Sequence, residues 1–201
     1  MTTATNEHAS RSVTFLGFLF ALAASLGSVW MSLALPVPGE PDLQFGAGLT
    51  ACPLCFYQRG FALGVTAVLA VGLLTSMRNG PFLSLLALPM VLGGLGVALF
   101  HVSLEARGIL ECPLGVMEMG SVPTQSLAVF VMLTVILGLD ARRGCCRADA
   151  EPSFGKCAGV TALVLGIALA VGSIASAPPL PPKPTKPYDT PLTVCRPPYV
   201  P

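Results

Sequence analysis

Five apolar runs, each about as long as a membrane-spanning helix, constrain the fold of this chain more than any other feature. None contains a charged residue, and they cover Val13–Leu35, Gly60–Ser76, Pro81–Phe100, Val122–Leu139 and Cys157–Ala177. A helix needs about 20 apolar residues to cross the hydrocarbon core of a bilayer. Charged residues make up 10% of the chain, against about 25% in an ordinary soluble domain. The sequence therefore predicts an all-α membrane protein.

These runs divide the chain into successive parts. We expect a short N-terminal segment at 1–12, a four-helix transmembrane bundle at 13–140, a basic linker at 141–156, a fifth transmembrane helix at 157–177 and an extended Pro-rich tail at 178–201. The second helix extends upstream to include 52–59. The first run is too long for the core of a signal peptide, so we expect a retained helix. Clustered glycines in the third span suit close helix packing in lipid.

Basic residues in the loops orient the bundle, because cytoplasmic loops carry an excess of Lys and Arg. The linker before the fifth span holds the largest group, namely Arg142, Arg143, Arg147 and Lys156. With this linker inside, the loops 36–50 and 103–121 and the C-terminal tail lie outside, although the tail itself is basic. The net charge is +1 and no basic cluster is interleaved with aromatic residues, so nothing indicates a nucleic-acid partner.

The same topology sorts the seven cysteines into two groups. The outer group is Cys52, Cys55, Cys112 and Cys195, and the inner group is Cys145, Cys146 and Cys157. In bacteria the outside is oxidising, and an even number of thiols there suits disulfide formation or exchange. We interpret the three inner cysteines as free thiols or membrane-edge packing residues without a redox role.

Cys52-Pro53-Leu54-Cys55 is a C-x-x-C motif at the expected start of the second helix. Proline is well tolerated in the first turn of a helix, where the backbone N–H groups lack intrahelical partners. Those N–H groups and the helix dipole stabilise a thiolate and so lower the pKa of a cysteine. The motif therefore indicates redox chemistry, with both thiols on one face of the helix.

Polar residues follow the motif at the same depth. Arg59 lies one turn beyond Cys55 on the same face, where it either snorkels to the headgroups or meets a polar partner. Gln58 and Tyr57 lie beside it, and Tyr57 also suits an interfacial aromatic belt.

His101 closes the third span on the same side as the C-x-x-C motif. It is either an ordinary interfacial residue or a functional one. Glu105, four residues on, is placed to pair with it.

Together these residues resemble the bacterial DsbB family. The resemblance rests on Cys52-Pro-Leu-Cys-Phe-Tyr-Gln-Arg59, on Phe100-His101-Val-Ser-Leu-Glu105 and on a cysteine in the next outer loop, and it covers about Val13 to Asp140. Members of this family are inner-membrane enzymes that reoxidise the periplasmic thiol oxidase DsbA and reduce a quinone. The resemblance thus implies a quinone-dependent, disulfide-generating oxidoreductase of the bacterial inner membrane. Its cofactor would be ubiquinone or menaquinone from the membrane pool, and its partner a DsbA-like thioredoxin-fold protein.

The resemblance also implies roles for individual residues. Cys55 would face the quinone and Cys52 would exchange with an outer cysteine pair, of which Cys112 is one member. Arg59 would polarise a quinone carbonyl, and His101 would assist proton delivery. The predicted catalytic residues are Cys52, Cys55, Cys112 and Cys195, the predicted quinone-binding residues are Arg59, His101, Tyr57 and Gln58, and no metal is expected.

The chain departs from the family pattern in its second outer loop. That loop normally holds two cysteines, whereas 103–121 contains only Cys112. Our hypothesis is that Cys195 replaces the missing partner, since an extended tail at about 3.1 Å per residue has a reach of about 50 Å. In the alternative, Cys112 acts alone through a transient mixed disulfide with Cys52, and Cys195 is a free thiol of the tail.

Two functions of other classes compete with this interpretation. One is a membrane protein that binds or transfers Cu(I) or Zn(II) through its outer cysteines and His101, although the cationic Arg59 beside the thiols disfavours it. The other is a non-catalytic membrane subunit whose tail recruits a Pro-recognising partner.

Overall fold

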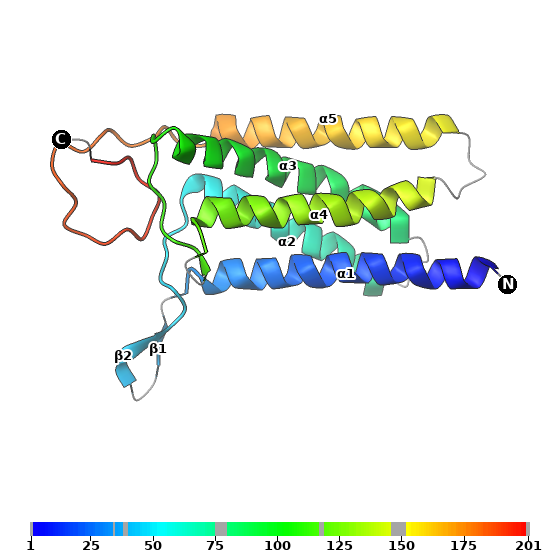
Figure 1. The fold of residues 1–201 in the computed structure, drawn as a ribbon, viewed down its shortest axis with the longest axis horizontal. Coiled ribbons are helices and arrows are strands. Elements are labelled where there is room, and N and C mark those ends of the chain that lie inside the picture. The colour runs from blue at the N-terminus through cyan, green and yellow to red at the C-terminus, as the bar shows by residue number, and fades with distance from the viewer. Residues whose placement is uncertain are drawn as a thin grey trace.

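The computed structural model describes residues 2–33, 35–37, 40–74, 80–116, 119–145 and 152–199. Its helices are α1 (Thr2–Trp30), α2 (Pro53–Leu74), α3 (Gly80–Ala106), α4 (Val122–Cys145) and α5 (Pro152–Ser176). All five run side by side along the long axis of the molecule, and the C-terminal tail loops out beyond one end (Figure 1). This arrangement confirms the predicted all-α membrane bundle.

The first four helices form a closed bundle. α1 contacts α2 and α4, and α3 contacts the same two helices from the other side, while α5 packs mainly on α3. Small and aliphatic side chains and one aromatic ring fill the centre, including Ala62, Val65, Leu69, Ala87, Val91, Leu133 and the ring of Phe130. Large apolar side chains also point outward from the bundle, as lipid-facing residues do, among them Phe15, Leu63, Leu86, Val135 and Val164.

Glycines allow α3 to approach its neighbours closely. A Cβ atom added to Gly94 would overlap the ring of Phe130 on α4, and one added to Gly96 would lie 2.6 Å from the Cβ of Ala170 on α5. The prediction of glycine-mediated packing in the third span is therefore confirmed. The same interfaces hold α3 in place, and α3 carries His101.

Four helices in the described part of the chain are long and apolar enough to cross a membrane. They are Ser12–Trp30, Pro53–Leu74, Pro81–Ala106 and Val122–Arg143. The apolar part described for α5, Val160–Ser176, is shorter. The protein is thus a multi-pass membrane protein, and a crossing by α5 remains a prediction.

Several helix boundaries differ from the sequence prediction. α1 already begins at Thr2 and ends at Trp30 rather than at Leu35, because Leu35–Val37 is strand β1, which pairs antiparallel with β2 (Glu40–Phe45). Pro36 within β1 also lacks the N–H that would continue a helix. α3 continues beyond Phe100 to Ala106. His101 therefore lies inside the helix and not at its end.

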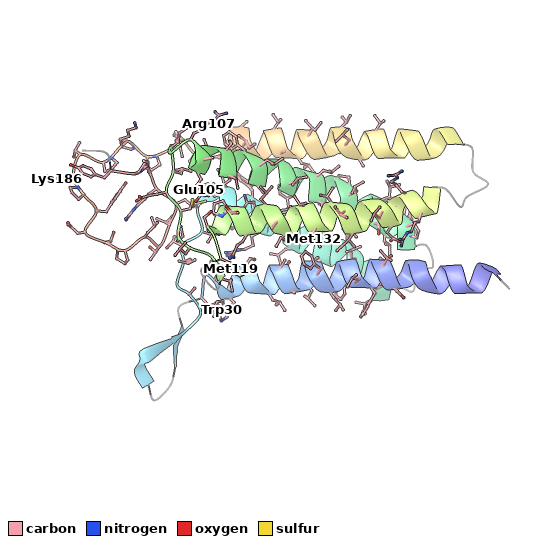
Figure 2. The ribbon with its side chains drawn as sticks, viewed as in Figure 1. Trp30, Glu105, Arg107, Met119, Met132 and Lys186 are labelled. Atoms are coloured by element: carbon pink, nitrogen blue, oxygen red, sulfur yellow. A yellow bond between two sulfur atoms is a disulfide. The ribbon has the colours of Figure 1, made fainter. Side chains whose placement is uncertain are left out.

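The tail leaves α5 at Ser176, loops outward and returns to the same end of the bundle (Figure 1). Lys186 lies on its outermost part (Figure 2). On its return, the backbone of Arg196 forms an isolated antiparallel bridge with Glu111, and the carbonyl of Thr193 accepts a hydrogen bond of 2.9 Å from the N–H of Thr50. The tail is extended, as predicted, but it docks on the bundle. We call this end, where α2 and α4 begin, the site end.

Candidate redox site

The C-x-x-C motif caps the N-terminus of α2. Cys52 directly precedes the helix, and its Sγ accepts a hydrogen bond of 3.2 Å from the backbone N–H of Cys55, as a serine or aspartate side chain does at an N-cap. Pro53 occupies the first helical position, which suits a residue without an N–H. The two sulfur atoms lie 2.8 Å apart, and both cysteines are free thiols. The motif therefore places the pair side by side, as predicted.

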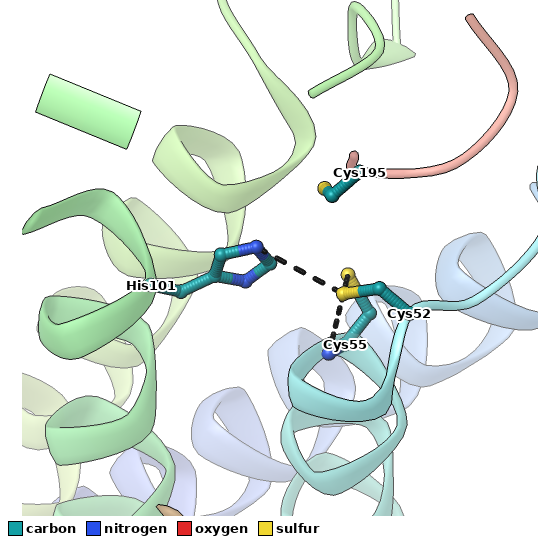
Figure 3. A group of neighbouring side chains, drawn as sticks. All are labelled: Cys52, Cys55, His101 and Cys195. Atoms are coloured by element: carbon teal, nitrogen blue, oxygen red, sulfur yellow. Dashed lines mark hydrogen bonds between the residues drawn. The ribbon is translucent and has the colours of Figure 1, made fainter. Parts of the chain in front are cut away.

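His101 approaches this pair from α3 (Figure 3). Its side chain is fully buried, and its Nε2 lies 3.8 Å from the Sγ of Cys52 and 3.6 Å from the Sγ of Cys112. On the other side of the ring, the amide of Gln58 lies 3.5 Å from Nδ1. The expected pairing of His101 with Glu105 is wrong, because the carboxylate of Glu105 accepts a hydrogen bond of 2.6 Å from the hydroxyl of Ser121. His101 is thus a buried contact between two cysteine pairs.

The surroundings of Cys52 favour its thiolate. A hydrogen bond from the Cys55 thiol, with smaller effects from His101 and the Cys55 backbone N–H, lowers the pKa of Cys52 from 9.0 to about 5, although burial opposes this change. A low pKa raises the fraction of the nucleophilic form at neutral pH. The Cys52 thiol is therefore in a form that reacts in thiol–disulfide exchange.

Cys112 and Cys195 form a disulfide across 83 residues of sequence. This is the pairing that we hypothesised from the shortage of cysteines in the loop 103–121, and the alternative with a free Cys195 does not describe the structure. The bond brings the Sγ of Cys195 within 4.8 Å of the donor atoms of Cys52, Cys55 and His101 (Figure 3). All four predicted outer cysteines thus meet at the site end.

The tail is held beside this disulfide by contacts that the sequence analysis did not single out. Nε of Arg196 forms an ion pair of 2.9 Å with Oε1 of Glu111, and the Arg196 guanidinium lies 3.7 Å from the centre of the Tyr188 ring. The hydroxyl of Tyr188 donates a hydrogen bond of 2.9 Å to the carbonyl of Pro197. The sequence indicates the ion pair only through position, because the opposite charges of Glu111 and Arg196 directly adjoin Cys112 and Cys195.

A cavity of about 300 Å³ opens beside the cysteines. Residues of α1, α2 and α4 and of the neighbouring loops line it, and among them are Cys55, Gln58, Arg59 and Cys195. Most of the remaining lining is apolar or small, including Ala23, Ala24, Met31, Ala62, Val129 and Phe130. The cavity therefore combines an apolar interior with one thiol and one cation.

Arg59 has unused hydrogen-bonding capacity at this cavity. Its Nη2 donates to the hydroxyl of Ser32 at 2.7 Å, so the guanidinium meets a polar partner on α1. Its Nε is buried and finds no hydrogen-bond partner within the part of the chain that the structure describes. A buried N–H without a partner is costly, and a ligand oxygen in the cavity would satisfy it.

Two of the predicted quinone-binding residues lie elsewhere. The hydroxyl of Tyr57 is 3.1 Å from that of Ser176 on α5, and its side chain lines a second, apolar cavity of about 270 Å³ between α2, α3 and α5. His101 contacts the sulfur atoms but is not among the residues that line the first cavity. Only Gln58 and Arg59 of that predicted set line it.

The inner cysteines fall largely outside the described residues. Cys146 lies in an undescribed segment, and the side chains of Cys145 and Cys157 are likewise outside the description. Their interpretation as residues without a redox role stays a prediction.

A membrane helix bundle that carries a C-x-x-C dithiol, an adjacent disulfide and a cavity reaching one of the thiols defines a membrane thiol–disulfide oxidoreductase. The chain matches the family described as Disulfide bond formation protein DsbB over residues 10–177, and it belongs to that family. The match includes α5, and so extends beyond the four spans on which the resemblance was based. No curated protein and no solved structure matches the chain.

Proposed function

We propose that this protein reoxidises a periplasmic DsbA-like dithiol protein and passes the electrons through Cys52 and Cys55 to a membrane quinone. One observation carries the proposal. The Sγ of Cys195 lies within 4.8 Å of both C-x-x-C sulfur atoms, and Cys55 in turn lines the cavity that contains Arg59. The outer disulfide Cys112–Cys195, the inner pair Cys52–Cys55 and the cavity therefore form one continuous path for electrons.

The first transfer is a thiol–disulfide exchange at the outer pair. A thiolate of the reduced partner attacks the Cys112–Cys195 bond, and the second thiolate of the partner resolves the mixed disulfide. The partner leaves as a disulfide, and Cys112 and Cys195 are left as thiols. Two electrons and two protons have then entered the chain.

The second transfer passes these electrons to the inner pair when it is oxidised. The thiolate of Cys195 attacks Cys52 and expels Cys55, and Cys112 then attacks Cys195 to restore the outer disulfide. Cys52 is the residue that His101 contacts, and Nε2 of His101 also lies 3.6 Å from Cys112. His101 is therefore placed to hold or deliver a proton at both sulfur atoms during the exchange.

The cavity residues fit a quinone. Apolar walls suit the ring, and the unpaired Nε of Arg59 suits a carbonyl oxygen. A bound ubiquinone or menaquinone supplies the two-electron acceptor. Arg59 contributes a fixed positive charge where negative charge develops on the oxygen, Gln58 contributes a polar amide, and Cys55 presents its sulfur from the cavity wall.

We assign the protein to the bacterial inner membrane with the site end on the periplasmic side. Arg142 and Arg143 lie in the last turn of α4, at the opposite end, where the positive-inside rule expects the cytoplasm. α5 leads from that end back to the docked tail (Figure 1), which supports a fifth crossing. The oxidising side is also where a Cys112–Cys195 disulfide persists.

Quinone reduction by a reduced thioredoxin-fold dithiol protein tests the function directly. Cys55→Ser should abolish turnover, because the thiol that lines the cavity is removed. Cys157→Ser, a cysteine at the predicted inner boundary, is the matched control and should leave turnover unchanged. Retained quinone reduction in Cys55→Ser would refute the assigned path.

A further inference from the structure

Four metal-ligating side chains converge at the site end. The sulfur atoms of Cys52, Cys55 and Cys195 and a ring nitrogen of His101 all lie within 4.8 Å of one another (Figure 3). Three cysteines and one histidine are a donor set that Zn²⁺ binds tetrahedrally in proteins, with sulfur atoms about 3.8 Å apart. In the zinc-bound form the ligand atoms would adjust from their present positions to that separation. Cys52 and Cys55 move apart from 2.8 Å, and the wider pairs move closer.

We propose that the fully reduced protein binds one Zn²⁺ through Cys52, Cys55, Cys195 and His101, and that the Cys112–Cys195 disulfide controls access to this site. While the disulfide is intact, the sulfur of Cys195 is neutral and bonded, so only three of the four ligands are available. Reduction frees a Cys195 thiolate, the form that ligates metal. The site is complete only when both cysteine pairs are reduced.

The charge balance supports this site. Zn²⁺ binds three thiolates and a neutral imidazole without any transfer of electrons, each ligand that is still a thiol releases its proton, and the complex has a net charge of −1. The Arg59 guanidinium lines the same cavity as Cys55 and Cys195, and it compensates that charge. Arg59 therefore opposes a bare cation but stabilises the anionic zinc thiolate complex.

The side chain of Gln58 is placed to orient His101 as a metal ligand. As placed, its amide donates to Nδ1 of His101 at 3.5 Å, which leaves the ring proton on Nε2, facing the sulfur atoms. Rotating the amide by 180° presents its oxygen instead, and this oxygen accepts a hydrogen bond from a protonated Nδ1. Nε2 is then free to bind metal, with Nδ1–H hydrogen-bonded as in most histidine metal sites.

Zinc at this position would inhibit the enzyme. The metal holds three of the four exchanging sulfur atoms as ligands, so neither disulfide can form until it leaves. Inhibition would therefore appear when electrons enter faster than the acceptor removes them. This consequence rests on the proposed function, whereas the metal site itself does not.

Cobalt binding to two matched variants tests the site. Both are made in a full-length background with Cys145, Cys146 and Cys157 changed to Ser, purified in detergent and reduced without oxygen. Cys112→Ser and Cys195→Ser both lose the outer disulfide, so they share any effect of that loss on folding. Only Cys112→Ser retains the four proposed ligands.

The Cys112→Ser variant should bind one Co²⁺ per chain with the visible absorption of a tetrahedral thiolate site, and Zn²⁺ should displace it. Cys195→Ser, and His101→Ala added to Cys112→Ser, should bind at least about tenfold more weakly, because each lacks a ligand. The background protein should bind Co²⁺ when reduced and not when its disulfides are formed. Equal binding by the two serine variants, or none by Cys112→Ser, overturns the proposal. The assay contains no quinone or partner, so failed turnover in a separate assay would refute the function and leave the metal site standing.

Discussion

Arg196 and Glu111 form an ion pair of 2.9 Å immediately beside the disulfide that joins their neighbours, Cys195 and Cys112. Their backbones also exchange two hydrogen bonds, of 2.8 and 3.0 Å. These contacts involve neither sulfur atom of the disulfide. We therefore expect them to keep Cys195 beside Cys112 and the C-x-x-C pair after the outer disulfide is reduced, when the cysteine has to act as a nucleophile.

Glu111→Gln should slow electron transfer from the outer pair to the inner pair. A partly exposed ion pair is worth about 0.5–1 kcal/mol, so the expected loss is roughly two- to fivefold. The measurement is the rate at which the reduced outer pair becomes oxidised at fixed quinone concentration. Lys186→Gln removes a charge from the exposed outer part of the tail and is the matched control. Equal rates in Glu111→Gln and the control would show that the ion pair does not position Cys195.

Arg59→Ala should raise the apparent KM for quinone. A hydrogen bond to a charged group contributes about 1.5–3 kcal/mol, which corresponds to a loss of binding of roughly tenfold or more. Arg59→Lys retains the charge but not the geometry of the guanidinium, so it should recover part of the loss. Ser32→Ala removes only the 2.7 Å anchor of Arg59 and should have a smaller effect. An unchanged KM in Arg59→Ala would show that Arg59 does not bind the quinone.

The reaction of Cys52 with iodoacetamide should show a low pH midpoint in the reduced protein. Its pKa of about 5 means that the thiolate predominates above about pH 6, so the rate should be nearly constant there and fall about tenfold per pH unit well below 5. The same lowered pKa makes the Cys52 thiolate stabilise the folded protein. This contribution to the free energy of unfolding is complete above pH 9.0 and is lost as the pH falls toward about 5. Mass spectrometry of the Cys52 peptide provides the rate.

Variants at Cys55 test the cause of that low pKa. Cys55→Ala removes the largest stabilising hydrogen bond and should move the midpoint upward, whereas Cys55→Ser keeps a donor and should move it less. A midpoint near 9.0 in the unaltered protein, or identical shifts in both variants, would contradict the argument.

Labelling from one side of the membrane tests the fifth crossing. Lys186 lies on the exposed outer part of the tail, so Lys186→Cys should react with an impermeant maleimide added to the periplasmic side. Cys145, at the far end of α4, should react only after the membrane is opened. Labelling of both from the same side would place α5 on the surface of the membrane instead of across it.

Helix geometry explains which of the predicted quinone-binding residues on α2 line the cavity. Residues three and four positions after Cys55 return to its face of the helix, and Gln58 and Arg59 do line the cavity with it. Tyr57 follows Cys55 by only two positions, about 200° around the helix, and it faces α5. The spacing alone therefore separates Tyr57 from the face of the helix that carries Cys55, and the role of each residue in quinone binding stays a prediction.

The environment of His101 was not predictable in the same way. His101 and the polar residues after it, such as Ser103, mark the end of the apolar run, but they do not end the helix. The hydroxyl of Ser103 donates a hydrogen bond of 2.6 Å to the carbonyl of Phe100 within it. The extension to Ala106 places His101 inside the bundle. No local pattern links Arg196 to Glu111, 85 residues away, and their contact is indicated only through the pairing of the adjoining residues Cys195 and Cys112.

Asp140 on α4 should stabilise the bundle without contributing to the redox chemistry. It is fully buried, and its Oδ2 accepts hydrogen bonds of 2.8 Å from Thr14 on α1 and 2.6 Å from Ser84 on α3. Asp140→Leu removes an acceptor shared by two hydroxyls, so it should cost about 1–3 kcal/mol, and Asp140→Asn, which keeps an oxygen, should cost less. Thermal unfolding in detergent measures the loss. Quinone reduction per folded molecule should not change, because Asp140 lies 18 residues or about 27 Å along α4 from Val122 at the site end. A variant that is fully folded but inactive would show instead that this carboxylate takes part in turnover.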